Sequence, residues 1–190
     1  EACMAGNVNN AGPLLATLTE INLDTIQWSI SKRRSGALTL LTLAASEGHA
    51  DFCQMLLAQG ADVNQPSEGM VVDSTISTVG VTPLIYACWK GRVNAVRVLL
   101  AVDNIDVNYH TDDGVTALCT SCHNGHLKVV ELLLTVDDIQ VNQADNDGRT
   151  PLYKAWQNGH WEVVKMLLAV GGVQVNQATD NGRIPLHDAC

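Results

Sequence analysis

The sequence predicts an all-α repeat solenoid, and a fixed period of 34 residues is the first observation behind this prediction. Glycines recur at this step from Gly80 onward, and a threonine series at the same step begins at Thr82. A third series begins at Gly91, and a pair of leucines follows each of its members. Periods of this size are typical of stacked supersecondary units. The members are Gly80, Gly114, Gly148 and Gly182; Thr82, Thr116, Thr150 and Ile184; Gly91, Gly125 and Gly159; and the leucine pairs 99–100, 133–134 and 167–168.

Each repeat is expected to contain two short helices. Thr82 before Pro83 is a helix start, because the hydroxyl can cap a backbone N–H and proline at the first helical position loses no hydrogen bond. Apolar residues three or four apart follow in both halves of the repeat and give each helix one apolar stripe. Gly91 ends the first helix, since glycine takes the left-handed conformation at little cost. Such a unit cannot bury its apolar faces alone, so neighbouring repeats must stack.

Several short motifs recur in a constant order along the chain. Three repeats open with Thr82-Pro83-Leu84, Thr150-Pro151-Leu152 or Ile184-Pro185-Leu186-His187. An alanine, a Gly-His pair, a Val-Val-x-x-Leu-Leu run and a Val-Asn pair then complete the pattern. With these motifs the chain resembles the ankyrin-repeat family over nearly its whole length. The resemblance implies a stack of helix-turn-helix units with β-hairpin fingers, and a protein-interaction module that is not an enzyme and needs no cofactor.

We expect a single ankyrin-repeat domain over residues 1–190. A partial repeat at 1–24 opens the chain and another at 182–190 closes it. Because the first residue is Glu1 and both ends fall inside a helix pattern, we expect the chain to be a segment of a longer protein. Complete repeats are predicted at about 36–64, 80–108, 114–142 and 148–176.

Two connections between repeats are longer than the others, and the extra residues lie at 25–38 and 65–79. In the first, Ile26, Trp28 and Ile30 alternate with polar residues. In the second, the turn-prone pair Asp73-Ser74 lies between β-prone flanks. These patterns favour two elongated β-hairpin fingers, and surface loops are the alternative.

Composition limits the classes of partner and compartment. The formal net charge of −9 disfavours binding to nucleic acid phosphates and favours a protein or peptide of basic character. No apolar run reaches the roughly 18 residues that a membrane helix needs. Four of the six cysteines share one repeat position that suits a small apolar side chain, which favours a reducing, intracellular and cytoplasmic location. These four are Cys3, Cys88, Cys122 and Cys190.

The segment Cys119-Thr-Ser-Cys122-His123 matches short redox, zinc and c-type haem patterns. The repeat explains the same residues, because Cys122 occupies the repeat position of Cys88, so we expect no metal site here. A metal or haem protein is nevertheless kept as one alternative function.

The candidate partner-binding residues lie at positions that the repeat does not dictate. In the family that the chain resembles, the finger tips and the residues just before the helix-ending glycine face a concave groove. A tryptophan beside an acidic rim has the character of a binding hot spot, although this tryptophan could instead cover a neighbouring helix. The residues are Trp89, Lys90, Asp112, Asp113, His123, Asn124, Asp145, Asp147, Arg149, Gln157 and Asn158.

The resemblance leaves two questions open, one about function and one about two asparagines. The segment is either a scaffold that binds a partner in its groove or a regulatory ankyrin module of a larger enzyme, channel or signalling protein. Asn64 and Asn108 look like targets of asparaginyl hydroxylation, and the alternative is that they bond adjacent fingers.

Overall fold

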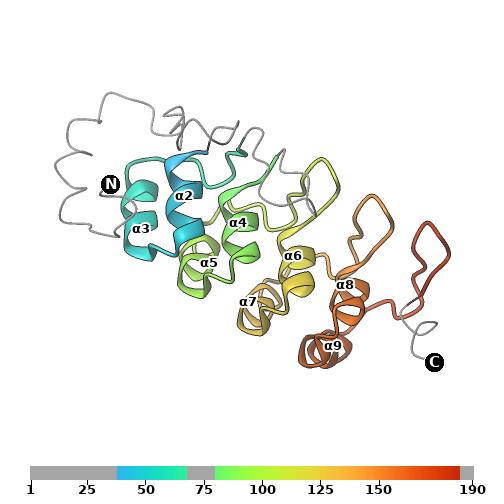
Figure 1. Ribbon diagram of the computed structural model, residues 1–190. Helices are drawn as coiled ribbons and strands as arrows, with labels where there is room; N and C mark the ends of the chain where they lie inside the picture. Colours follow the sequence, from blue (N-terminus) through green and yellow to red (C-terminus); the bar gives the residue numbers. More distant parts are fainter. Residues whose placement is uncertain (1–37, 68–79, 185–190) are drawn as a thin grey trace. The chain divides into compact units, whose positions relative to one another are not determined.

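The computed structural model describes residues 38–67 and 80–184, and in these ranges it holds eight α-helices in four successive pairs (Figure 1). The chain divides into two compact units, which we call the N-terminal unit, Glu1–Asp106, and the C-terminal unit, Val107–Cys190. The all-α repeat solenoid is confirmed. The helices are α2 (Leu40–Glu47), α3 (Ala50–Ala58), α4 (Pro83–Trp89) and α5 (Val93–Leu100) in the N-terminal unit, and α6 (Ala117–Asn124), α7 (Leu127–Leu133), α8 (Pro151–Gln157) and α9 (Trp161–Leu168) in the C-terminal unit.

The first helix of every pair begins at a threonine. The threonine backbone is extended, and its side-chain oxygen accepts a hydrogen bond from the N–H three residues later, at 3.0 to 3.3 Å. This bond satisfies one of the N–H groups that a helix start leaves without a partner. The four threonines are Thr39, Thr82, Thr116 and Thr150.

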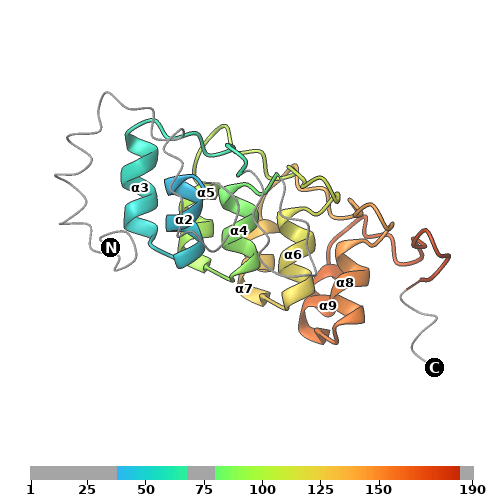
Figure 2. The ribbon, with the colours of Figure 1, turned by 45° about the horizontal axis from the view of Figure 1, so that its top comes forward.

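In the N-terminal unit, helices of the same kind lie side by side. Figures 1 and 2 show α2 beside α4, and α3 packs against α5. Leu41, Leu56, Leu84 and Leu99, one from each helix, are fully buried between them. Burial of one such side chain is worth about 1.5–3 kcal/mol. Each helix pair is therefore stabilised mainly by the pair beside it.

The C-terminal unit repeats this arrangement, with α6 beside α8 and α7 beside α9. Its apolar core includes Leu118, Leu133 and Leu167. The first helix α6 also buries polar side chains, and Ser121 Oγ donates to Ala117 O at 2.8 Å. Small residues such as Ser121 at this position leave room for the neighbouring helix.

In two of the described repeats a side chain after the helix turn bonds back to the preceding repeat. In the N-terminal unit Arg92 Nε donates to Ser46 O at 2.8 Å. In the C-terminal unit His160 Nε2 lies 2.9 Å from His123 O. Arg92 and His160 hold the same repeat position, just after the glycine. Both reach a carbonyl in the last turn of a first helix, where helix geometry leaves carbonyls without an internal partner.

The finger bases share one hydrogen-bond pattern. Thr111 N donates to Val115 O at 3.1 Å, and Ser67 N donates to Val81 O at 2.9 Å. Thr111 and Val115 enclose three residues, whereas Ser67 and Val81 enclose 13. The second insertion thus enters at the tip of an ordinary finger and keeps its base.

The rest of both insertions lies outside the described residues, since 68–79 and 1–37 belong to the undescribed part of the chain. The elongated β-hairpins therefore stay predictions. The partial repeat at 1–24 and most of the one at 182–190 also lie outside the described residues.

Asn64, Asn108 and Asn142 join consecutive repeats through both ends of their amides. Asn108 Nδ2 donates to Asp138 O at 2.9 Å, and Asn108 Oδ1 accepts from Gln140 N at 2.8 Å. Asn64 and Asn142 make the same pair of bonds with the loops of their following repeats. The bonding role expected for Asn64 and Asn108 is confirmed.

Gly125 has φ 71°, the left-handed conformation expected at the end of α6. A Cβ there would also lie 2.4 to 2.7 Å from atoms of the His160 ring. Gly159 has nearly the same φ, 73°, but no atom lies within 4 Å of its Cβ position. The two glycines thus differ in contact and not in backbone conformation.

We predict that Gly159→Ala costs about 1 kcal/mol of unfolding free energy and that Gly125→Ala costs about 1–3 kcal/mol, because only Gly125→Ala adds a clash to the backbone strain. Urea unfolding followed by circular dichroism measures both. Equal losses for the two variants would show that the His160 contact does not limit residue 125.

Candidate partner-binding surface

The candidate residues fall into two patches, one in each compact unit. The Trp89 patch, at the end of α4, consists of Trp89 and Lys90 in the N-terminal unit. The C-terminal patch consists of the ends of α6 and α8 and the tips of the fingers that precede these two helices. Its members from the sequence prediction are Asp112, Asp113, His123, Asn124, Asp145, Asp147, Arg149, Gln157 and Asn158.

In the Trp89 patch the indole ring is held by its neighbours. The buried Tyr86 ring meets it edge to face, with centroids 5.5 Å apart and planes at 84°. The ammonium nitrogen of Lys90 lies 4.1 Å from the centroid of the indole. A cation at this distance is attracted by the negative face of the ring. Trp89 is half-buried and Lys90 is exposed, so this aromatic-cation pair lies at the surface.

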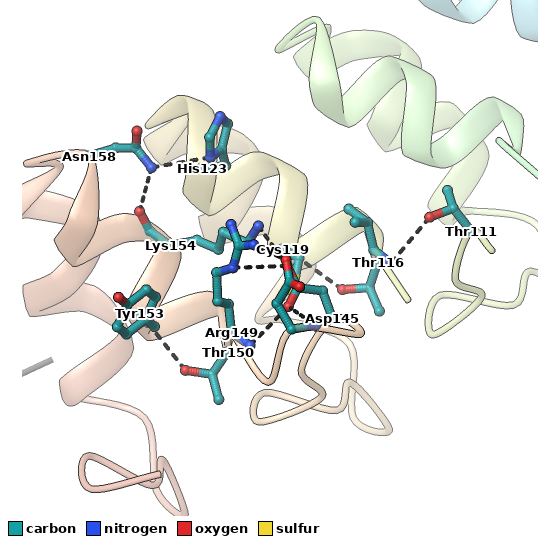
Figure 3. A network of polar contacts seen from close by, with 12 residues as sticks. Thr111, Thr116, Cys119, His123, Asp145, Arg149, Thr150, Tyr153, Lys154 and Asn158 are labelled. Atoms are coloured by element: carbon teal, nitrogen blue, oxygen red, sulfur yellow. Dashed lines mark hydrogen bonds and ion pairs between the residues drawn. The ribbon is translucent and has the colours of Figure 1, made fainter. Parts of the chain in front are cut away.

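In the C-terminal patch one side-chain amide, that of Asn158, joins the two helix ends. Asn158 Nδ2 donates to Lys154 O at 2.8 Å and lies 3.1 Å from His123 Nδ1 (Figure 3). Asn124 Nδ2 donates to Thr120 O at 2.8 Å. Because an amide N–H donates to His123 Nδ1, that nitrogen is unprotonated and Nε2 carries the proton. Both asparagines use their donors internally, which leaves their Oδ1 atoms as acceptors.

The protonation of His123 follows from its surroundings. Burial lowers its pKa, and the neighbouring basic side chains of Lys154, His160 and Arg149 lower it further. Below its ordinary pKa of 6.5, the unfolded chain therefore binds more protons at this residue than the folded chain does.

The finger tips of this patch are tied into a row. Asn146 N donates to Asp113 O at 2.9 Å, and Asn146 Nδ2 donates to Asp112 O at 2.8 Å. Asp180 N donates to Asp147 O at 3.1 Å in the same manner. Asp112 is exposed, and the Asp147 side chain is 62% exposed and pairs with Arg149. The backbone bonds fix the tips, while carboxylates project from them.

Asp145 departs from the prediction that it belongs to the exposed acidic rim. The residue is only 8% exposed, and its carboxylate lies 2.6 Å from Lys154 Nζ (Figure 3). It also accepts from the backbone N–H groups of Asp147 and Arg149, at 3.1 and 2.9 Å. Its bonds are those of a buried structural carboxylate that holds the finger against α8. Asp145 is therefore removed from the set of partner contacts.

Lys154 is the residue that sequence reasoning missed in this network. It holds the repeat position of Tyr86 and Thr120, and its side chain is 12% exposed. A lysine where the two preceding repeats carry Tyr86 and Thr120 is the signal in the sequence. The matching signal is Asp145, nine residues before Lys154, at the position that Thr111 occupies in the preceding repeat.

The cysteines of the C-x-x-C segment lie in the core. Cys119 and Cys122 are fully buried, and Cys119 Sγ donates to Gln143 O at 3.4 Å. Burial raises the pKa of Cys119 to about 11, so the sulfur stays a thiol at neutral pH. Reactive and metal-binding cysteines are thiolates instead. No group of three or more His, Cys, Asp or Glu side chains in the described residues is placed to hold a metal ion.

A family model, Ankyrin repeats (3 copies), matches residues 1–111, 68–145, 98–179 and 138–190. The chain belongs to the ankyrin-repeat family. Ankyrin repeats are generally protein-protein interaction modules. No curated protein sequence matches the chain. None of the helices described in this ankyrin-repeat chain has the length and apolar character needed to cross a bilayer.

We predict that Lys154→Met lowers the unfolding free energy by about 3–5 kcal/mol. The variant removes the close cation of the buried Asp145 carboxylate and leaves only the longer contact with Arg149 Nε, at 3.9 Å. In the double variant Asp145→Asn, Lys154→Met the loss should be smaller, since no buried charge remains. Chemical denaturation of the three proteins measures both quantities. A double variant less stable than Lys154→Met would contradict the assigned role of the ion pair.

We predict that the protein loses stability as pH falls below the ordinary histidine pKa of 6.5, because the lowered pKa of His123 opposes proton uptake in the folded state. The His123→Gln variant should lose less stability than the parent over the same range. Thermal unfolding of both proteins in a buffer series from about pH 7 to about pH 5 measures this. Parallel curves for the two would mean that His123 does not couple folding to pH.

Proposed function

We propose that this ankyrin-repeat segment is a binding scaffold for a protein or peptide of basic character, which lies in the concave groove. The observation that carries the proposal is the Trp89 patch, where a half-exposed indole is already positioned by Tyr86 and has a cation on its face. Interface hot spots are enriched in tryptophan, and they are strongest where the ring is held in place before binding.

The charge of the finger tips supports a basic partner. Asp112 and Asp180 are exposed, and the chain carries a net charge of −9. Charges at the rim of an interface mainly raise the rate of encounter and make it depend on salt. Acidic tips also repel nucleic acid phosphates, so the proposal excludes nucleic acid as the partner.

The proposed scaffold acts without catalysis and inside the cell. His123, the histidine of the C-terminal patch, is engaged by the Asn158 amide and not by a nucleophile. Cys53 and Cys119 are buried thiols outside any disulfide, which supports a reducing compartment. Regulation of a larger protein would use the same surface.

Selection of binding peptides from a random display library tests the proposal. We predict that Trp89→Ala weakens the selected peptides by about 2 kcal/mol or more, roughly thirtyfold in Kd, because it removes the central aromatic contact. Trp161→Ala is the matched control, since Trp161 is 57% exposed but lies on α9, outside both patches. The proposal fails if no peptide is selected, or if the two variants bind alike.

Charge reversal at a finger tip tests the acidic rim. We predict that Asp112→Lys slows association with a basic selected peptide and flattens its salt dependence, while dissociation changes little. Asp137→Lys makes the same change of net charge at another exposed site and is the control. Surface plasmon resonance at two salt concentrations separates them. An equal effect of both substitutions would assign the attraction to total charge and not to the tips.

A further inference from the structure

We propose that the indole face of Trp89 is the receptor for an arginine side chain of the partner, and that Lys90 occupies this face in the unbound protein. The inference rests on the proposed binding function and names the chemical group that the Trp89 patch recognises. It also assigns Lys90 a role as an internal competitor.

The first observation is the cation already present on the ring. Lys90 Nζ lies 4.1 Å from the ring centroid, within the roughly 6 Å over which a cation is attracted to an indole. Tryptophan has the strongest such attraction among the aromatic side chains. An exposed lysine thus reaches this face of the half-buried ring in the unbound protein.

The second observation is that the ring is fixed while its present ligand is loose. Tyr86 is buried and packs edge to face against Trp89, which orients the indole. Lys90 is exposed and comes from the next residue of the chain, so its ammonium is held by a flexible stem and by the cation–π contact itself. A fixed ring with a replaceable ligand suits exchange of one cation for another.

The surrounding charges allow a second cation to enter. Glu47 holds the repeat position of Lys90 on α2, which packs beside α4, and it is exposed. In the described part of the N-terminal unit, no ion pair joins Glu47 to Lys90. The other nearby cation, Arg92, is anchored through its Nε to Ser46 O. When Lys90 swings away, the incoming cation therefore restores the charge that Lys90 supplied.

Comparison with the other described tryptophans separates this ring from ordinary surface aromatics. Trp156 packs beside the Tyr153 ring, with centroids 5.8 Å apart. Trp161 is 57% exposed, yet of the three tryptophans that the structure describes, Trp89 is the one with a cation over it. Trp161 is therefore an internal control for nonspecific contacts with a charged ligand.

Arginine fits this site better than lysine. A guanidinium is planar and stacks on an aromatic face, and it is less strongly hydrated than an ammonium. It can therefore displace the Lys90 ammonium, which keeps more of its hydration. A partner lysine would replace one ammonium on the indole face with another and gain no additional attraction.

The test uses three short probes, acetyl-Gly-Arg-Gly amide, its lysine analogue and its citrulline analogue, which keeps the shape of arginine without the charge. Nitrogen-proton spectra record the indole signals, and Trp89→Phe assigns the Trp89 signal. We expect the arginine probe to shift the Trp89 signal in a saturable manner and the Trp161 signal not at all. The lysine probe should bind more weakly, and the citrulline probe should leave the Trp89 signal unmoved.

The Lys90→Gln variant tests the internal competition. Removing a cation held by an exposed cation–π contact of about 0.5–1 kcal/mol should tighten the arginine probe by about two- to fivefold. Unchanged affinity in Lys90→Gln would overturn the competition. An unmoved Trp89 signal, or equal shifts with arginine and citrulline, would overturn the site, and a lysine probe as tight as arginine would overturn the preference.

The outcome is separable from that of the proposed function. If displayed peptides bind and depend on Trp89 but the probe does not shift its signal, the scaffold stands and the arginine site falls. If the probe shifts the Trp89 signal and no displayed peptide binds, the arginine site is supported and the proposed scaffold function fails.

Discussion

Stacking of one helix pair on the next is the constraint on which the rest of the structure depends. The helices have seven to nine residues, too few to be stable alone in water. Their leucines are buried by neighbouring pairs, and side chains such as His160 and Arg92 bond the carbonyls where the preceding repeat's first helix ends. The asparagines that link successive loops add a second line of such bonds. Most residues that recur in every described repeat therefore make contacts between neighbouring repeats.

The same constraint determines where recognition can occur. The residues just before the helix-ending glycines and the residues at the finger tips differ between repeats, because stacking does not demand a particular side chain there. Trp89, His123 and Gln157 share one such position and have unrelated chemistry. Their backbone conformation is nevertheless defined, since the turn and the tip make hydrogen bonds on both sides. Variable side chains on a fixed backbone are the general arrangement for binding without a large entropic cost.

Much of the fold could be predicted from the sequence because its signals are local. Thr82 caps its own helix and Gly125 ends its own helix. Asn108 recurs as Asn142 one repeat later in the chain. The candidate surface was less predictable, because the burial of a side chain depends on its contacts in the folded chain, which the repeat pattern does not specify. Asp145 and Asp147 look alike in the sequence. In the structure Asp145 is buried in an ion pair with Lys154 of the next helix, whereas Asp147 is exposed. The contact of Lys90 with Trp89 depends on side-chain orientation, which no repeat pattern encodes.

Hydrogen exchange with and without a selected peptide tests most directly the central claim, that partners bind at the first-helix ends and finger tips. The account predicts that binding slows exchange at residues 86–91, 111–115, 120–125 and 145–149, where these ends and tips lie. Amides of the second helices α3, α5, α7 and α9 should exchange at unchanged rates. Protection confined to the second helices, with the first-helix ends and tips unaffected, would contradict the account.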